Sequence, residues 1–405
     1  MIARTVLCLG LSAVCAAQNG GWIRPGVPYV SHFTGVLGVA GDLNSDGIDD
    51  LFGIGRDMRR IRVATFIFSG ADGTVLSSRL QQDYQSIIGH AEAGDMNGDG
   101  HGDYAIAVLD ASSIGRTRIE VRSSRDHSLI WKYSLPGNNG LGTSIVGNID
   151  LNGDGKSDLV ATAPGWANRQ GTIVALDHGG RVLHFLSATA ALAFGDLFTQ
   201  ACLGRSGDVD GDGCEDFVSG GLDKRTNPGG VGCAIVMSGR TGKILRIGHA
   251  QRPGVFLGDA VDGCGDVDGD GVPDFVAGSW SRRWRSGLRV FSGRTGNTIW
   301  SYDSDTFDLG SVEYVRGRFD FDRDGVPDIA YGGIGLIRVL SGRDGTRLHE
   351  RRGYPGHFLG EGIQFLRPHT GDAFPMVVTA EPAWGDYAPG ATRGRIIAIR
   401  GGPEG

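Results

Sequence analysis

One nine-residue pattern recurs six times along this chain of 405 residues and constrains its fold more than any other feature. Every copy reads Asp-x-(Asn/Asp)-x-Asp-Gly-x-x-Asp, so that oxygen-bearing side chains stand at positions one, three, five and nine. Carboxylates that converge in one tight turn repel one another unless a hard cation lies among them. The pattern therefore predicts loops that bind Ca²⁺, with up to six ions in the whole chain.

Each predicted loop has the same set of ligands. Oxygen atoms come from the side chains of positions one, three, five and nine and from the backbone carbonyl of position seven, while the glycine at position six permits the sharp bend. A single copy is also typical of a plain Asp- and Gly-rich turn, but six copies favour metal binding. The predicted metal-binding residues are Asp42, Asn44, Asp46, Ile48 and Asp50; Asp95, Asn97, Asp99, His101 and Asp103; Asp150, Asn152, Asp154, Lys156 and Asp158; Asp208, Asp210, Asp212, Cys214 and Asp216; Asp266, Asp268, Asp270, Val272 and Asp274; and Asp320, Asp322, Asp324, Val326 and Asp328.

Other calcium loops differ from this pattern in the residues after position nine. An EF-hand needs a glutamate at position twelve, where this chain has Gly53, Ile106, Ala161, Ser219, Ala277 and Tyr331. Instead, an apolar and strand-like run comes after each loop, as at residues 159–163. We therefore expect each loop to join two strands.

The loops repeat with a period that suits a propeller blade. Successive loops begin 53 to 58 residues apart. An apolar-Gly step such as Leu141-Gly142 precedes the loops, with a displaced copy at Phe194-Gly195 in the fourth repeat, and a hairpin signal such as residues 238–242 comes after four of them. Each repeat is thus predicted to form four strands, with the loop between the first and the second.

A seventh repeat begins at Leu359-Gly360 without a metal loop, since residues 369–373 contain a single carboxylate. Residues 375–380 and 395–400 are predicted strands, but no fourth strand comes after them, so we expect the segment from Trp22 to about Val30 to complete this blade. Closure of the ring protects the edges of the sheets. The predicted fold is all-β: a seven-bladed β-propeller of four-stranded antiparallel blades, closed by the N-terminal strand.

These features together resemble the FG-GAP repeat propellers, the seven-bladed fold of the integrin α-subunit head, and the related VCBS repeats of secreted bacterial proteins. The resemblance covers residues 18–405 and rests on the loop, the apolar-Gly step and the period. The Gly-Ala-Pro ending that is common in the family is approached only at residues 161–165. The resemblance implies that the metal loops lie on one face of the ring, that the loops between second and third strands lie on the other, and that the protein acts in cell adhesion or binding.

The N-terminus indicates export from the cell. Residues 1–17 are predicted to be a signal peptide, because a short basic start precedes an apolar run that is too short to span a bilayer and ends at Ala16 and Ala17. A buried first strand is the alternative, and lipidation of Cys15 stays open. No later segment is long and apolar enough for a transmembrane helix, so we expect a secreted or cell-surface protein with a propeller at residues 18–405.

Four cysteines remain after residue 17. Cys202, Cys214, Cys233 and Cys264 all lie in the fourth and fifth repeats. One or two local disulfides are expected, with three possible full pairings, and buried free thiols are the alternative.

Tryptophans and arginines concentrate in the loops between second and third strands. The candidate ligand-binding residues are Trp166, Arg169, Trp280, Arg283, Trp284 and Trp384. Exposed aromatic rings beside arginines suit stacking on sugars or contact with anionic groups, although the same tryptophans could instead cap the ends of blades. We expect a binding or adhesion module for an unidentified protein or carbohydrate, in which calcium is mainly structural.

Catalysis and nucleic-acid binding have little support in the sequence. The formal net charge is −7, and no metalloprotease helix, nucleophile elbow or phosphate loop occurs, so we expect no enzyme and no nucleic-acid partner. The alternative is a calcium-dependent, lyase-like enzyme that acts on polysaccharides. Residues 290–300 are similar to a quinoprotein hairpin, but any propeller can use such a hairpin.

Overall fold

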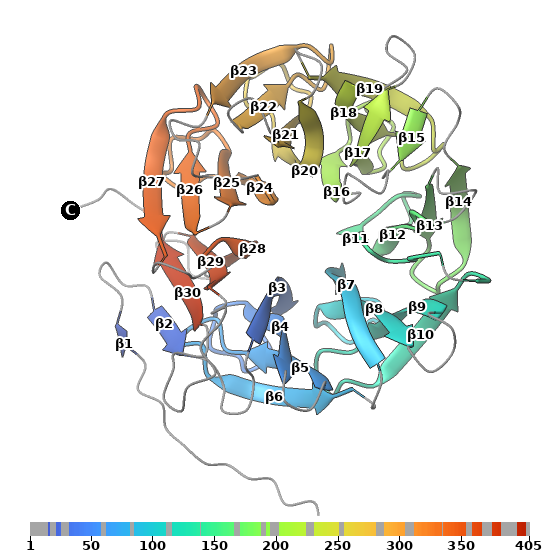
Figure 1. The fold of residues 1–405 in the computed structure, drawn as a ribbon, viewed down its shortest axis with the longest axis vertical. Coiled ribbons are helices and arrows are strands. Elements are labelled where there is room, and N and C mark those ends of the chain that lie inside the picture. The colour runs from blue at the N-terminus through green and yellow to red at the C-terminus, as the bar shows by residue number, and fades with distance from the viewer. Residues whose placement is uncertain are drawn as a thin grey trace, which may run out of the picture.

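The computed structural model of the chain describes residues 15–16, 22–25, 32–57, 62–81, 85–110, 116–137, 139–165, 171–187, 192–194, 202–223, 231–250, 255–280, 287–303, 312–333, 335–353, 359–366, 375–381 and 395–401. Figure 1 shows that these residues form seven β-sheets arranged as a ring. They contain strands and no helix. The all-β, seven-bladed fold predicted from the sequence is confirmed.

Blades 1 to 6 come one after another in chain order, and the first strand of each lies nearest the axis. Blades 1 to 3 contain β3 (His32–Gly41), β4 (Asp50–Asp57), β5 (Arg62–Phe68) and β6 (Val75–Leu80); β7 (Gln85–Gly94), β8 (Asp103–Asp110), β9 (Arg116–Arg122) and β10 (Leu129–Ser134); and β11 (Ile145–Ile149), β12 (Asp158–Thr162), β13 (Thr172–Leu176) and β14 (Val182–Ser187). Blades 4 to 6 contain β16 (Leu203–Gly207), β17 (Asp216–Asp223), β18 (Val231–Met237) and β19 (Ile244–His249); β20 (Phe256–Gly265), β21 (Asp274–Trp280), β22 (Gly287–Phe291) and β23 (Thr298–Asp303); and β24 (Tyr314–Phe319), β25 (Asp328–Gly333), β26 (Leu336–Leu340) and β27 (Arg347–Arg352).

Blade 7 joins the two ends of the chain. Its strands β28 (Glu361–Leu366), β29 (Met376–Glu381) and β30 (Arg395–Arg400) are completed by β2 (Trp22–Pro25), which pairs antiparallel with β30 through Ile23 and Ile397. Trp22–Pro25 thus takes the place that the sequence predicts for a closing strand. A two-residue strand, β1 (Cys15–Ala16), pairs with β2 and lies inside the predicted signal peptide, whose removal stays a prediction.

Blade 4 departs from the regular pattern at its inner edge. Two short strands, β15 (Leu192–Phe194) and β16, both pair with β17, one at each end of it. The displaced apolar-Gly step of this repeat falls at the end of β15, since Phe194 is its last residue. The sequence irregularity therefore marks an inner strand that is divided into two pieces.

The core of the ring lies between blades. The described residues form seven clusters of buried apolar side chains, and each cluster joins two neighbouring blades, including blades 7 and 1. Second and third strands are mostly buried, and entirely so in β12 and β13, whereas the outermost strand β6 alternates between half-buried and exposed residues. Because every sheet is covered on both faces by its neighbours, the middle strands are mostly apolar runs, whereas the outermost strands and inner strands such as β24 show alternation.

The apolar-Gly step allows this close packing. Leu257 and Leu359 are fully buried, and the glycines that come after them adopt φ of 104° and 102°. The carbonyl of Gly258 lies so close to Gly220 of the preceding blade that a Cβ there would be 1.9 Å from its oxygen. Glycine is needed at these points because two backbones approach each other directly.

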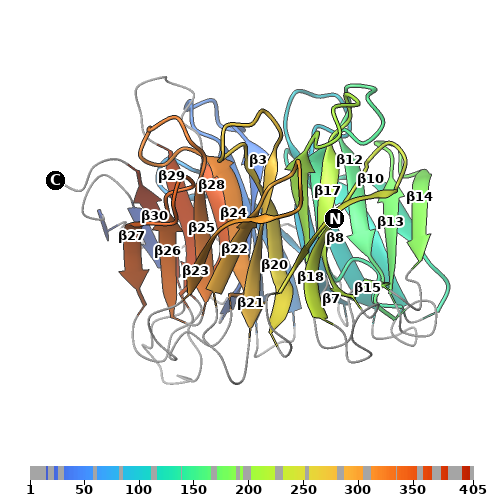
Figure 2. The same cartoon turned by 90° about the horizontal axis from the view of Figure 1, so that it is seen from above.

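Antiparallel pairing assigns the connections to two faces of the ring, which Figure 2 shows edge-on. The predicted metal loops join first and second strands, and tight turns join third and fourth strands, so both sets lie on the same face. All six turns close with a backbone hydrogen bond, including the two that depart from the common sequence, at His127 and Gly180. His127 adopts φ 62° where glycine stands in the other five turns.

Candidate functional site

The aspartate at position one organises each predicted metal loop. In all six loops one of its carboxylate oxygens accepts the N–H of the glycine at position six, at 2.8 to 2.9 Å. These glycines have φ between 76° and 86°, and a Cβ on any of them would meet nothing within 4 Å. Glycine is therefore required for the left-handed backbone and not for space.

The aspartate at position nine is fully buried in every loop. One of its oxygens accepts the N–H of position two, at 2.6 to 3.0 Å. In five loops the other oxygen accepts an N–H of the turn between third and fourth strands, as from Gly293 to Asp274 at 2.9 Å. In the second loop, Asp103 Oδ1 is buried and has no hydrogen-bond partner among the described residues.

Position nine thus has a role that the sequence pattern did not predict, because it joins the loop to the turn of the same blade. Burial raises the pKa of Asp103, Asp158, Asp216 and Asp328 to about 7, and that of Asp50 and Asp274 to about 6, although the N–H groups oppose the shift. Buried carboxylates of this kind are poorly solvated, and a bound cation would favour their ionised form.

The carboxylates converge most clearly in blades 4 to 6. Oxygen atoms of positions one, three and nine lie within 4.8 Å of one another in the sets Asp208, Asp210 and Asp216; Asp266, Asp268 and Asp274; and Asp320, Asp322 and Asp328. In blades 1 to 3 position three is asparagine, and its side-chain oxygen accepts the N–H of position five, as from Asp99 to Asn97 at 2.8 Å. The donor set is oxygen only in all six loops, which suits a hard divalent cation.

Position five stands apart from these clusters, because another group binds its carboxylate. In blades 4 to 6 an arginine of the turn between third and fourth strands pairs with it: Arg240 with Asp212 at 3.1 Å, Arg294 with Asp270 at 2.9 Å, and Arg343 with Asp324 at 3.1 Å. The repeated Ser-Gly-Arg of these turns was a sequence signal for this contact.

Blades 1 to 3 engage position five differently. The amide of Asn44 donates to Asp46 at 2.8 Å, and that of Asn97 donates to Asp99 at 3.2 Å. In blade 3, His178 Nδ1 lies 3.6 Å from Asp154 Oδ2. Arg125 occupies the turn of blade 2, but within the described residues it makes no ion pair with Asp99.

The side chains at position seven point to no common chemistry. They are Ile48, His101, Lys156, Cys214, Val272 and Val326. The backbone N–H of each donates to position five, at 2.8 to 3.0 Å. Only their carbonyls remain as the predicted ligands, and that part of the ligand set stays a prediction.

The predicted ligand-binding residues fall almost entirely outside the described residues. Trp166, Arg169, Arg283, Trp284 and Trp384 are not described. Trp280 ends β21, where its backbone pairs with Phe256, and its side chain is not described. Ligand binding by the loops between second and third strands therefore stays a prediction from the sequence.

The expected disulfides do not form. Cys202, Cys214, Cys233 and Cys264 are free thiols, and the last three are buried. Cys233 packs in the core between blades 3 and 4, whereas Cys264 packs in the core between blades 5 and 6. The alternative of buried free thiols is therefore the correct one, because the cysteines lie in separate interfaces of the ring.

Comparison with known proteins agrees with this geometry. The FG-GAP repeat family model matches residues 142–176, which contain the loop of blade 3 and the strands on both sides of it. A solved structure of BBS1N in complex with ARL6DN, soaked with lead, is similar over 93% of this chain and 96% of that chain, with a TM-score of 0.53 and 13% sequence identity. At this identity the likeness shows the fold alone. The comparison with curated proteins gives no match.

Proposed function

Because the chain contains an FG-GAP repeat and folds as a seven-bladed β-propeller, we propose that it is a secreted binding or adhesion module whose loops hold structural Ca²⁺. The observation that carries the calcium proposal is the convergence of three carboxylates in each of blades 4, 5 and 6. A hard cation neutralises such a cluster, and calcium accepts the flexible, oxygen-rich coordination that these loops offer.

A structural role is inferred from the elements that each loop connects. Positions one and nine hold the loop on itself and on the neighbouring turn, and no helix pair that could open occurs among the described residues. Positions one, three and nine would hold the ion, with position five and the carbonyl of position seven beside them. The ion would supply the positive charge that lets buried carboxylates stay ionised.

The calcium proposal is tested by counting ions. We expect native mass spectrometry of the protein to show up to six bound Ca²⁺, and the Asp268→Ala variant to bind one fewer. Asp303→Asn, an exposed change on β23, is the matched control and should leave the count unchanged. A wild-type protein without bound calcium at millimolar concentration would contradict the proposal.

Export and ligand binding are the further parts of the proposal. The predicted signal peptide supports export, and the described part of the chain has no apolar helix of bilayer-spanning length. A protein or carbohydrate ligand is expected on the face opposite the metal loops. Alanine at Trp280 and Trp284 should weaken binding on a glycan array or a protein panel, and unchanged binding everywhere would exclude this face.

We propose no enzymatic activity. None of the comparisons favours the lyase alternative. Incubation with uronic-acid polymers is its test, since β-elimination would raise the ultraviolet absorbance.

A further inference from the structure

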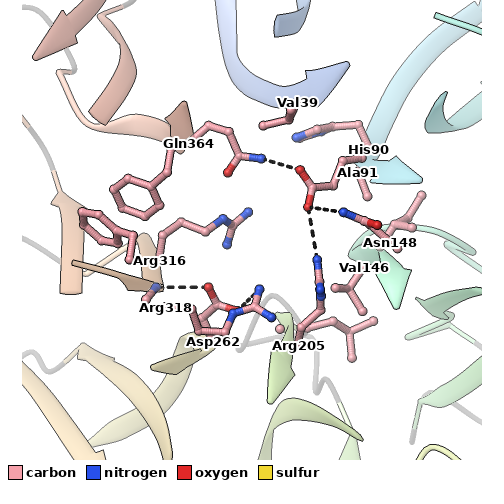
Figure 3. A pocket seen from close by; sticks show the side chains of 18 of the residues that line it. Val39, His90, Ala91, Val146, Asn148, Arg205, Asp262, Arg316, Arg318 and Gln364 are labelled. Carbon is pink, nitrogen blue, oxygen red and sulfur yellow. Dashed lines mark hydrogen bonds and ion pairs between the residues drawn. The ribbon is translucent and has the colours of Figure 1, made fainter. Parts of the chain in front are cut away.

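The innermost strands of the ring enclose a polar cavity of about 390 Å³ that the proposed function does not use. Figure 3 shows side chains from several blades pointing into it. The cavity lies beside the ends of the inner strands that lead into the metal loops, because Arg318 stands two residues before Asp320 and Asn148 two residues before Asp150. Its volume is in the range of small-molecule sites.

The carboxylates that line this cavity are already engaged. Glu92 accepts hydrogen bonds from Gln364 at 2.9 Å and Asn148 at 3.5 Å, and it lies 3.6 Å from Arg205. Asp262 accepts the N–H of Gly317 at 3.2 Å and lies 3.9 Å from Arg318. Asp49, which also lines the cavity, has a partner as well. Because each of these carboxylates already has a partner, the cavity does not favour a bound cation.

The guanidinium groups that line the cavity, in contrast, have N–H donors without acceptors. Arg316 points into the middle of the cavity (Figure 3), and its hydrogen bond goes to the neighbouring carbonyl of Val315 at 3.0 Å. No carboxylate of the described residues pairs with it. The Nε atoms of Arg205 and Arg318 are buried and have no acceptor among those residues. Buried donors without acceptors are costly, and a water, an ion or a ligand in the cavity would satisfy them.

Left-handed backbone conformations occur at the ends of the inner strands, beside the cavity. In blades 1, 2, 4 and 5 the residue before the loop is a glycine with a positive φ: Gly41, Gly94, Gly207 and Gly265. In blades 3 and 6 the left-handed residue is not glycine and lies one position earlier, two residues before the loop: Asn148, at φ 54°, and Arg318, at φ 69°. Side chains rarely adopt this backbone, and such strain gathers at functional sites. Both exceptions line the cavity, where glycine would supply no donor.

His90 contributes a neutral ring to the cavity, whose lining otherwise contains three carboxylates and three guanidinium groups. Burial and the nearby Arg316 lower the pKa of His90 to about 3, so its ring is neutral near pH 7. The ring packs edge-on against Phe52. A neutral imidazole can hydrogen-bond an anion without a charge of its own.

We propose that this cavity binds a small oxyanion, a phosphate or carboxylate group, between Arg316 and the free Nε–H groups of Arg318 and Arg205. A guanidinium presents two parallel N–H donors to two oxygens, which matches either group and gives strong, charge-assisted hydrogen bonds. The site lies beside the predicted metal loops and uses none of their predicted ligands.

Isothermal titration of the calcium-loaded protein with inorganic phosphate, and separately with succinate, tests the site and distinguishes the two chemistries. We expect at least one of them to bind with a stoichiometry of one. Arg316→Gln and Arg318→Gly should each weaken binding at least tenfold. Arg318→Gly should also keep or raise the melting temperature, because glycine accepts the left-handed backbone, and this separates loss of binding from loss of folding.

Arg116→Gln, an exposed arginine on β9, is the matched control and should bind as wild type does. Spectra of the arginine Nε–H groups should shift for Arg205, Arg316 and Arg318 upon addition of the anion. The proposal is wrong if neither anion binds to the wild-type protein. It is equally wrong if binding persists in Arg316→Gln, which would place the anion on the calcium ions or elsewhere.

Discussion

The predicted metal loops of blades 1 to 3 and those of blades 4 to 6 share one backbone but balance their charges differently. In the first group position three is asparagine, so each loop has three carboxylates at the ligand positions. In the second group it is aspartate, and the fourth carboxylate coincides with an arginine of the adjacent turn that pairs with position five. An added negative charge is thus accompanied by an added positive one.

If only the predicted side-chain ligands and the paired arginine are counted, the two groups reach the same net charge by separate routes. A loop with three aspartates and one Ca²⁺ carries one net negative charge, and so does a loop with four aspartates, one arginine and one Ca²⁺. Repulsion among carboxylates grows with each added charge, and a nearby guanidinium offsets it. We therefore expect all six loops to bind calcium and to fail together when it is removed.

Removal of calcium should have the largest effect on the stability of the folded protein. Ligand linkage stabilises the folded protein by about 2.7 kcal/mol for each loop when free Ca²⁺ is about 100 times its Kd. A chelator should therefore lower the melting temperature strongly in a fluorescence-monitored melt. Hydrogen exchange in the chelated protein should show loss of protection in both groups of loops. A melting temperature that does not change would refute the calcium assignment, and loss confined to blades 4 to 6 would break the equivalence.

Substitution of the aspartate at position nine should have the second-largest effect on stability. Asp274→Ala leaves two backbone N–H groups without their acceptor, those of Val267 and Gly293, whereas Asp103→Ala removes one well-formed bond, that from Met96, and a weaker contact from the Ser124 backbone. Each unpaired buried donor costs about 1–3 kcal/mol, so Asp274→Ala should lower the free energy of unfolding by about 1 kcal/mol more than Asp103→Ala does. Denaturant titration of both variants at one calcium concentration measures the difference. Equal losses would mean that the turn contact contributes nothing.

A smaller effect is expected for the turn arginines. Arg294 is half-exposed, and exposed ion pairs contribute about 0.2–1 kcal/mol. Arg294→Gln should therefore destabilise the protein within that range in the presence of a chelator and tighten calcium binding at its own loop. Arg125→Gln in blade 2 is the matched control, since Arg125 makes no such pair among the described residues. Similar effects of the two changes would show that the ion pair between the turn arginine and position five does not distinguish the two groups of loops.

The smallest effect is a coupling energy. Asp268→Asn converts the loop of blade 5 to the type found in blades 1 to 3, and should weaken calcium binding there. Combined with Arg294→Gln, it restores the charge balance of the first group, so the double variant should be closer to wild type than the two single changes predict. We expect a coupling of about 0.5 kcal/mol from a double-mutant cycle on denaturation midpoints. Strict additivity would show that aspartate and arginine act independently.

Much of the fold was predictable because its signals are local. The left-handed glycine at position six and the N–H groups that Asp42 and its equivalents accept lie within a few residues of one another, so each loop is encoded in its own nine residues. The turns are equally local, and even the two irregular ones close. The closing strand was predictable for a different reason, since the last repeat lacks one strand and the N-terminus has one to offer.

Other features were not predictable because they depend on neighbours in space. The expected disulfides are wrong, since Cys233 and Cys264 fall in different blade interfaces that share no sequence signal. The turn arginine of blade 2 does not pair as those of blades 4 to 6 do, because Asn97 already donates to Asp99 there. The aspartate at position nine accepts hydrogen bonds from the turn as well as from the loop, and the spacing of the motif predicts only its contact with the loop.

The sequence by itself determines the six loops, the repeat of four strands and the closed ring, because each depends on backbone preferences over a few residues repeated at one period. Only the tertiary structure decided what the axis of the ring contains. Gln364 donates to Glu92 across 272 residues of chain, and Arg316 has no carboxylate partner among the described residues in the cavity that they share. Such convergence depends on ring closure, which brings together inner strands whose side chains have no local relation.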